Sequence, residues 1–193
     1  ERRRRDHVTA KQNIARAAAS LVPANATVFI DAGTTCLLAA RELMQRDDVR
    51  IFTNSVSVLA AATGTSATVA GIGGELRSAT QAMVGSLALR WLEQLRFDIA
   101  LLGASGTDET GLSTTELTEA AVKQAVIDAS GKTLLLADAG KWARPATVRF
   151  ASWDRVDRWV VDRQPDVPTA TRRAMNIKLT VGATRRSRRR KRA

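Results

Sequence analysis

Short apolar runs alternate with segments of helical periodicity along most of the chain. The runs at residues 97–102 and 133–137 are apolar on both faces, which is typical of strands that helices cover on both sides. No internal repeat and no long linker divides the body of the chain. The sequence therefore predicts a single α/β domain in which helices cover both faces of a mainly parallel sheet.

The same periodicity places the individual elements. Strands are predicted at residues 28–30, 49–52, 67–72, 97–102, 133–137, 158–161 and 177–181, with a further short segment at 148–152. Helices are predicted at residues 8–22, where Thr9 can act as the cap, and at 34–45, 56–62, 82–95, 116–129 and 169–175. The helix at 82–95 is expected to carry an apolar stripe of Met83, Leu87, Trp91 and Leu95. A polar loop is expected at residues 107–115.

Glycine, hydroxyl and charged residues gather directly after five of the predicted strands. Because the carboxyl ends of parallel strands share one edge of a sheet, these corners are expected to meet where open α/β sheets bind ligands. Any single corner could be an ordinary turn, but five at one edge favour a ligand pocket. The corners are residues 31–35, 53–55, 73–75, 103–106 and 138–141.

The corner at residues 31–35 has the sequence Asp-Ala-Gly-Thr-Thr and lies between a strand and a helix. Backbone N–H groups at a helix N-terminus lack partners within the helix, and the helix dipole favours an anion there. Gly33 lets the backbone approach a ligand closely, and the hydroxyls of Thr34 and Thr35 add donors. The corner therefore suits a phosphate group. The alternative is that Thr34 only caps the helix.

The basic charge of the chain is concentrated at its ends. The formal net charge is +11, of which residues 185–192 hold seven and residues 1–6 hold a net of two, so the body is close to neutral. Such ends are usually solvated tails, although they can add salt-sensitive affinity for DNA or RNA that does not depend on sequence. A nucleic-acid-binding module acting through the tail is thus a separate hypothesis, which deleting the tail would test.

Several other classes of protein are disfavoured. A single cysteine, Cys36, allows no internal disulfide and no cysteine-rich metal cage, and a single histidine, His7, disfavours a histidine metal site. We expect no metal and no cofactor. The chain has no secretion signal and no apolar run long enough to span a membrane, so a reducing cytoplasm is the expected location.

Six segments, taken in order, resemble the motifs of the effector-binding domain of the DeoR family of bacterial transcriptional regulators. Residues 31–35 and 53–55 are similar to the family's Asp-Ser/Ala-Gly-Thr-Thr turn and its Thr-Asn-Ser loop. The other four resemble its Gly-Gly-x-x-Arg, Gly-Ala-x-Gly, Glu-Ala-x-Val-Lys and Leu-Ala-Asp-Ser-Ser-Lys motifs, at residues 73–77, 103–106, 119–123 and 136–141. Each motif is weak alone, but together they are specific, and the resemblance covers residues 11–162.

The resemblance implies a fold shared with ribose-5-phosphate isomerase and CoA transferases, and a phosphorylated sugar or related metabolite as the effector. Phosphate would lie on Gly33, Thr34 and Thr35, near Asn54 and Ser55. The complete set of implied binding residues is Asp31, Gly33, Thr34, Thr35, Asn54, Ser55, Gly74, Arg77, Gly103, Lys123 and Lys141, with Glu119 and Ser105 as weaker candidates.

Some of these residues have alternative roles. Arg77 could be a solvated loop residue, and Asp31 could merely stabilise its turn. Glu119 and Lys123 have the i, i+4 spacing of an ordinary helix ion pair. Two departures from the family pattern also matter. Ala139 and Gly140 replace two serines, which leaves the identity of the effector open, and Cys36 replaces a common third threonine and is expected to pack in the core.

The resemblance also implies a domain organisation. Residues 1–22 would be a basic start and linker helix, residues 23–182 the effector-binding domain and residues 183–193 a basic flexible tail. The N-terminal winged helix-turn-helix of the family is absent from this chain, so operator DNA would be bound only through that missing domain. The parent regulator is expected to be a repressor and a homo-oligomer. Effector is expected to order the loops around Arg77 and residues 107–115, and the first helix to transmit the change.

The competing function is an isomerase-like enzyme on the same fold. Aldose–ketose isomerisation needs a base beside the carbon that loses its proton. In the isomerases, acids follow the Gly-Ala turn and a Lys-Gly-x-Gly stretch lines the site, whereas here Ser105 and Gly106 follow the turn and no such stretch occurs. Glu119 is the remaining candidate base. The sequence therefore predicts binding without turnover.

Overall fold

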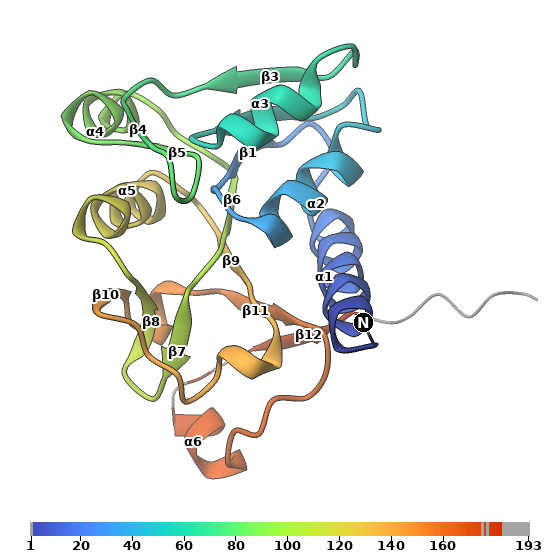
Figure 1. Cartoon of the computed structure of the whole chain (residues 1–193), viewed down its shortest axis with the longest axis vertical. Helices are drawn as coiled ribbons and strands as arrows, with labels where there is room; N and C mark the ends of the chain where they lie inside the picture. The colour runs from blue at the N-terminus through green and yellow to red at the C-terminus, as the bar shows by residue number, and fades with distance from the viewer. Residues whose placement is uncertain (1, 175, 177, 183–193) are drawn as a thin grey trace, which may run out of the picture.

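The computed structural model describes residues 2–174, 176 and 178–182. Its centre is a seven-stranded sheet in which all six neighbouring pairs run parallel (Figure 1), so the predicted fold class is confirmed. In spatial order the strands are β12 (Leu179–Val181), β11 (Arg158–Val161), β9 (Thr133–Leu136), β6 (Ile99–Leu102), β1 (Thr27–Ile30), β2 (Arg50–Thr53) and β3 (Thr68–Gly71). The basic tail expected at residues 183–193 lies outside the described residues.

Helices cover both faces of this sheet, as the alternating strand pattern requires. Val28 and Ile30 of β1 pack in one core cluster with side chains of α1 (Arg2–Ser20), α2 (Thr34–Leu43) and α3 (Val56–Ala62). Phe29 belongs to the opposite cluster, with side chains of α4 (Ser86–Glu93) and α5 (Leu117–Asp128). The short helix α6 (Thr169–Ala174) lies apart from both layers (Figure 1). No described helix has the length and apolar character that crossing a membrane requires.

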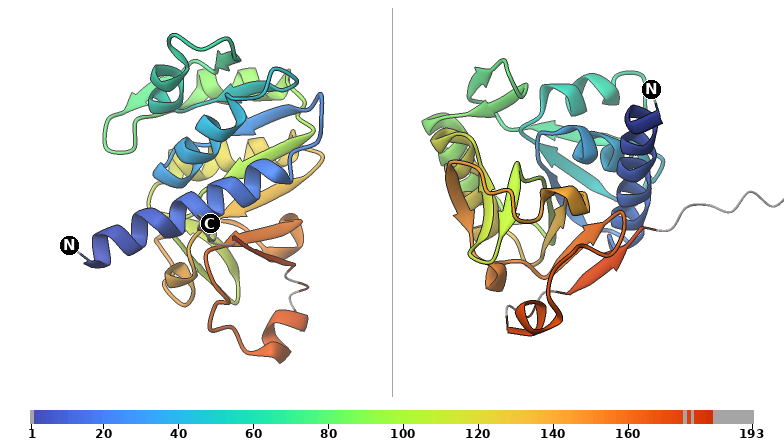
Figure 2. Two further views of the ribbon diagram at one scale, coloured as in Figure 1. Left: turned by 90° about the vertical axis from the view of Figure 1, so that its right-hand side faces the viewer. Right: turned by 60° about the horizontal axis from the view of Figure 1, so that its bottom comes forward.

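The first helix is longer than expected. It begins at Arg2, so Thr9 lies inside it and the prediction that Thr9 caps the helix is wrong. The side chains of Ile14, Ala15 and Ala18 are buried against α2, whereas the N-terminal part of α1 projects beyond the rest of the molecule (Figure 2, left). Only about the last two turns of α1 are therefore held by the core.

A small three-stranded antiparallel sheet replaces the polar loop that was expected at residues 107–115. It consists of β10 (Val148–Ala151), β8 (Gly111–Thr114) and β7 (Gly106–Asp108). Thr107 and Ser113 of this sheet are buried because their hydroxyls find partners: Thr107 donates to the Lys141 carbonyl at 3.3 Å and Ser113 to the Gly106 carbonyl at 3.1 Å. The hydroxyl-rich segment at residues 106–114 is therefore a hairpin and not a polar loop.

The helix predicted at residues 82–95 is wrong over its first turn. A two-stranded hairpin, β4 (Glu75–Arg77) and β5 (Ala82–Val84), comes first, and Gly85 with φ +89° then serves as the N-cap of α4. The predicted stripe is also wrong, because α4 buries Ala88 and Leu92 and leaves Leu87 and Trp91 exposed.

Two short 3₁₀ helices, η1 (Ala139–Lys141) and η2 (Trp153–Arg155), bring three indole rings together. The ring centroid of Trp153 lies 5.5 Å from that of Trp159, and Trp142 lies 6.3 Å from both. This aromatic cluster packs on the same side of the sheet as α5.

Candidate functional site

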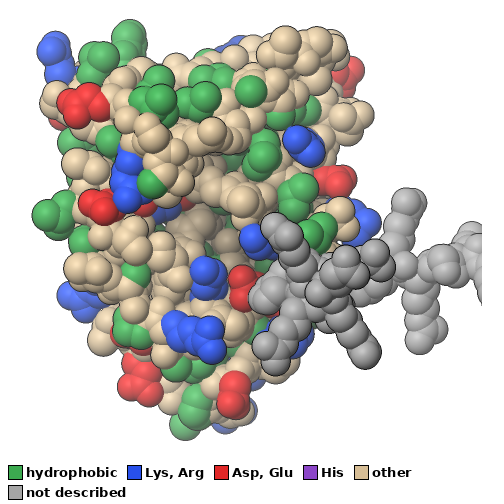
Figure 3. Space-filling view, viewed as in Figure 1, with side chains coloured by type: hydrophobic (Ala, Val, Ile, Leu, Met, Phe, Trp, Pro, Cys, Tyr) green, Lys and Arg blue, Asp and Glu red, His purple; other side chains and the backbone are tan. Residues whose placement is uncertain are grey.

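A cavity of about 790 Å³ lies at the carboxyl ends of the central strands. It is lined by the corners that follow β1, β2, β6 and β9, together with residues from α1, α5 and the turn between β4 and β5. The space-filling view shows the molecule hollowed near the centre of this face (Figure 3). The sheet topology therefore brings together corners that are up to about a hundred residues apart.

Ten of the thirteen residues proposed from the sequence line this cavity, and three do not. The ten are Asp31, Gly33, Thr34, Thr35, Asn54, Gly103, Lys123 and Lys141, with the weaker candidates Ser105 and Glu119. Ser55 instead caps α3, where its hydroxyl oxygen accepts from the Val58 N–H at 3.3 Å. Gly74, at φ +148°, packs beneath β5, since an added Cβ would lie 2.4 Å from the Val84 carbonyl oxygen.

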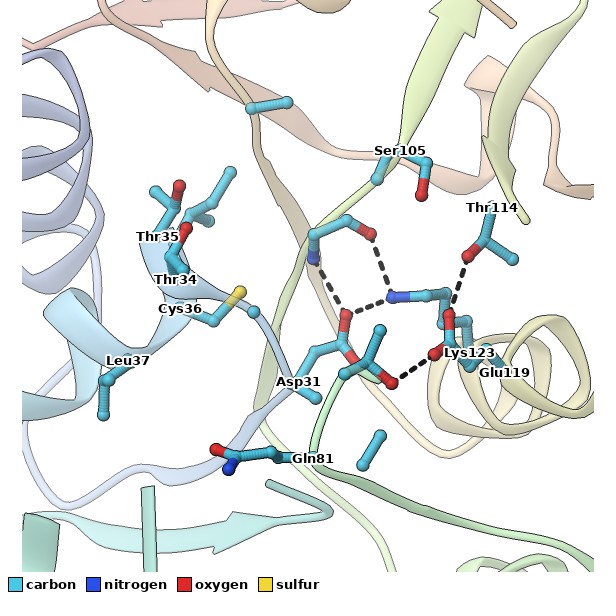
Figure 4. Close-up of a pocket in the computed structure, with 18 of the residues that line it drawn as sticks. Asp31, Thr34, Thr35, Cys36, Leu37, Gln81, Ser105, Thr114, Glu119 and Lys123 are labelled. Carbon is cyan, nitrogen blue, oxygen red and sulfur yellow. Dashed lines mark hydrogen bonds and ion pairs between the residues drawn. The ribbon is translucent and has the colours of Figure 1, made fainter. Parts of the chain in front are cut away.

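Gly33 is the N-cap of α2, so the alternative in which Thr34 caps this helix is wrong. Gly33 has φ +137° and no side chain, and no side chain caps the first turn. The N–H groups of this turn thus border the cavity beside the hydroxyls of Thr34 and Thr35 (Figure 4). The Nζ atom of Lys11 on α1 donates to the Thr34 hydroxyl oxygen at 2.8 Å.

Asp31 and Lys123 form a buried ion pair on the opposite wall of the cavity (Figure 4). The Asp31 carboxylate also accepts from the Gly103 N–H at 3.0 Å, and Lys123 donates to the Gly103 carbonyl at 3.1 Å. The Lys123 ammonium lies 5.4 Å from the centroid of the Phe150 ring. These contacts link the corner after β1, the corner after β6 and helix α5 into one rigid unit.

Glu119 is held by a second set of contacts. One carboxylate oxygen accepts from the Arg77 guanidinium at 3.0 Å and from the Thr80 hydroxyl, and the other accepts from the Thr114 hydroxyl at 2.9 Å. Arg77 also pairs with Glu116 at 3.1 Å, so it is a fixed residue outside the cavity lining. The i, i+4 pair between Glu119 and Lys123 is not among the ion pairs of the described residues.

Sequence reasoning missed two basic residues of the cavity, Lys11 and Arg144. Lys11 falls in the predicted linker helix, and its position at the cavity depends on how α1 packs against α2. Arg144 follows η1 in a stretch without a recognisable motif. Lys11, Lys141 and Arg144 take part in none of the ion pairs formed by the described residues, unlike Lys123 and Arg77.

Cys36 points toward the core, as expected. Its thiol is buried and lies 3.8 Å from the Leu101 carbonyl. Burial, with a smaller contribution from the Asp31 carboxylate, raises the pKa of this thiol far above its ordinary value. The group is therefore neutral and unsuited to nucleophilic chemistry.

The chain was compared with known proteins. A family model described as the DeoR C terminal sensor domain matches residues 6–163. The chain is 35% identical over 159 residues to the glycerol-3-phosphate regulon repressor of Escherichia coli (strain K12), which covers 81% of this chain and 63% of the repressor. It is 33% identical over 153 residues to the HTH-type transcriptional regulator GlpR of Haloferax volcanii, covering 79% and 60% of the two chains. The chain thus spans about three fifths of the length of these relatives.

A solved structure shares the fold. Ribose 5-phosphate isomerase A from Methanocaldococcus jannaschii is 20% identical, with a TM-score of 0.51 over 69% of this chain and 54% of the isomerase. At this identity the likeness concerns the fold alone. The sequence match, the family model and the parallel sheet agree, and the chain belongs to the DeoR family of transcriptional regulators, as its C-terminal sensor domain.

Proposed function

We propose that this domain senses a phosphorylated sugar or related metabolite for a repressor, and that it binds this effector without turning it over. The observation that carries the proposal is the uncapped N-terminus of α2, which faces a cavity that also contains Lys11, Lys141 and Arg144. Backbone N–H groups at a helix N-terminus together with cations that have no carboxylate partner favour a dianionic phosphate.

The opposite wall of the cavity suits hydroxyl groups. The Asp31 carboxylate and the Lys123 ammonium hold each other, so neither presents a free charge, yet both retain hydrogen-bonding capacity. A ligand with a phosphate at one end and hydroxyls at the other fits this polarity. Glycerol 3-phosphate is the first candidate, because relatives from Escherichia coli and Haemophilus influenzae are named glycerol-3-phosphate regulon repressors.

Three carboxylates of the described residues line the cavity, those of Asp31, Glu119 and Asp138, and each is a possible base for the isomerase-like alternative. All hydrogen bonds of Glu119 go to Arg77, Thr80 and Thr114, and they hold both of its carboxylate oxygens. Asp31 is paired with Lys123. The third, Asp138, caps η1, where one of its oxygens accepts from the Gly140 N–H at 3.1 Å. A general base must reach the proton that it removes, and each of these carboxylates is already held by other groups. This arrangement supports binding without isomerisation, and assays for ketose formation from ribose 5-phosphate are expected to show none.

Titration calorimetry of the purified chain tests the proposal. Glycerol 3-phosphate or a sugar phosphate from a small panel should bind, whereas the matching compound without phosphate should bind at least tenfold more weakly. Lys141→Met should weaken binding, and Lys132→Met, at an exposed residue outside the cavity, should not. Equal binding of the phosphorylated and unphosphorylated compounds would contradict the proposal, as would ketose formation that depends on Glu119.

Two further parts of the proposal concern the whole regulator. Operator DNA would be bound by the winged helix-turn-helix expected of the family, and the regulator would act as a homo-oligomer. The predicted boundaries, with a linker helix before residue 23 and an effector domain over residues 23–182, also remain proposals. The proposal does not include the ordering of loops around Arg77 and residues 107–115 that the sequence predicts. Residues 106–114 form a hairpin, and two carboxylates hold Arg77.

A further inference from the structure

Of the described residues that line the cavity, Lys11 is the one that comes from α1. We propose that the Lys11 ammonium is a ligand of the effector phosphate, so that the bound effector fastens α1 to the N-terminus of α2. The inference rests on the proposed function and adds the regulation of the same site. It assigns a binding role to a helix whose other described contacts are mainly packing against the core.

Lys11 lies where the helix dipole and nearby cations favour an anion. Its Nζ atom lies 2.8 Å from the hydroxyl of Thr34, the first residue of α2, at the end of the helix where the dipole is positive. Lys11 makes no ion pair with a carboxylate among the described residues, and Lys141 and Arg144 line the same cavity. A phosphate at this point would be attracted by both the helix and the cations, and Lys11 has two further N–H donors to offer it.

The packing of α1 makes this contact consequential. Ile14 and Ala18 are fully buried and anchor the C-terminal part of the helix, whereas Val8, one turn before Lys11, is 51% exposed. Figure 2 shows the preceding turns projecting away from the body. Lys11 therefore lies at the boundary between the anchored and the projecting parts of α1, where one added attachment restrains the projecting part most.

Thermodynamic linkage makes the effect reciprocal. If bound phosphate favours the attached position of α1, then any partner that holds α1 in that position must raise the affinity for phosphate by the same factor. A partner that pulls α1 away must lower it. Ligand binding and the position of α1 are thus thermodynamically coupled.

The test uses the full chain and its Lys11→Met, Lys11→Gln and Lys132→Met variants, with glycerol 3-phosphate as the probe and glycerol as its unphosphorylated counterpart. Calorimetry should show an affinity for glycerol 3-phosphate about tenfold lower in both Lys11 variants and unchanged in Lys132→Met. Hydrogen exchange of the backbone amides of residues 8–13 should slow when wild-type protein is saturated with the probe. In Lys11→Met at saturation this slowing should be lost.

The outcomes separate the inference from the function on which it rests. If the wild-type chain binds no member of the phosphate panel, the proposed function fails. If the wild type binds and Lys11→Met binds equally well or more tightly, the inference is overturned while the proposed function stands. Weaker binding by Lys11→Met with undiminished protection of residues 8–13 also overturns it, because α1 would then respond without Lys11.

Discussion

Asp31 and Lys123 show how one buried pair can organise a site. Their side chains are only 3% and 8% exposed, and each is also hydrogen-bonded to the backbone of Gly103. Two charges taken out of water stabilise a fold little when they are paired, but removing one partner leaves the other without compensation. The pair therefore acts mainly to fix the positions of two corners and of α5.

The first prediction concerns this pair. Lys123→Met should lower the free energy of unfolding by about 3–5 kcal/mol, because it leaves the Asp31 carboxylate buried and unpaired. The double variant Asp31→Asn, Lys123→Met should recover a substantial part of the loss. Urea unfolding followed by circular dichroism measures both.

Arg155→Met is the matched control, since the Arg155–Asp128 pair is largely exposed at 47% and 67%. It should change the stability by less than about 1 kcal/mol. Losses that simply add in the double variant would show that Asp31 and Lys123 are not coupled.

At the scale of elements, both small hairpins depend on close backbone contacts. Gly106 begins β7 in the buried hairpin, and a Cβ added there would lie 1.7 Å from the Arg144 carbonyl oxygen. This contact holds the hairpin against the segment that carries Lys141 and Arg144 into the cavity. A side chain at Gly106 would push those two residues away from their positions.

The second prediction follows from that contact. Gly106→Ala should lower the free energy of unfolding by about 3 kcal/mol, since overpacked positions cost roughly this much or more. Affinity for the effector should fall as well. Gly73→Ala is the control, because its added Cβ would meet only the Leu87 side chain at 3.7 Å, an ordinary contact. Equal stability of the two variants in urea unfolding would contradict the expected clash.

The central strands could be predicted from sequence, and the hairpins could not, for physical reasons. Residues 99–102 are apolar on both faces, and only a strand between two helical layers buries such a run. Ala82–Val84 is equally compatible with a strand or a helix, and the positive φ of Gly85 decides between them. The buried hydroxyls of Thr107 and Thr114 find their partners in Lys141 and Glu119, which no local pattern reveals.

The residues of the candidate site also fall into two groups, those that the local sequence reveals and those that it does not. Gly33, Thr34 and Thr35 could be proposed from the local sequence, because a helix that follows a strand exposes its first N–H groups wherever it occurs. Lys11 and Arg144 reach the cavity only through tertiary packing. The resemblance to the family's Gly-Gly-x-x-Arg motif makes Arg77 a candidate phosphate ligand, but distant Glu116 and Glu119 hold it outside the cavity lining.

On the scale of the whole molecule, the parallel sheet places the candidate corners at one edge, and large apolar side chains are exposed elsewhere. Three large side chains on β4 and α4 are more than half exposed: Leu76 at 55%, Leu87 at 52% and Trp91 at 53%. An exposed group of this kind is often a contact surface between subunits. It lies outside the residues that line the cavity, so association there would leave the ligand site open.

The third prediction concerns this surface. The chain is expected to sediment as a dimer or larger species, and the double variant Leu87→Glu, Trp91→Glu should shift it toward the monomer without unfolding it. Sedimentation velocity over a range of concentrations measures the change. Leu117→Glu, on α5 and 74% exposed, is the control and should leave the distribution unaltered. Identical sedimentation of the wild type and the double variant would exclude this face.

The aromatic cluster of Trp142, Trp153 and Trp159 has a practical consequence. Trp142 directly follows Lys141 on the cavity wall, and its ring centroid is 6.3 Å from each of the other two. A ligand that draws Lys141 into the cavity is expected to shift the Trp142 ring relative to Trp153 and Trp159. The fluorescence of an indole ring depends on its surroundings, so such a shift should change the emission. In a Trp91→Phe background, where these three rings are the remaining tryptophans, the domain's own fluorescence becomes an unlabelled optical indicator for screening metabolites.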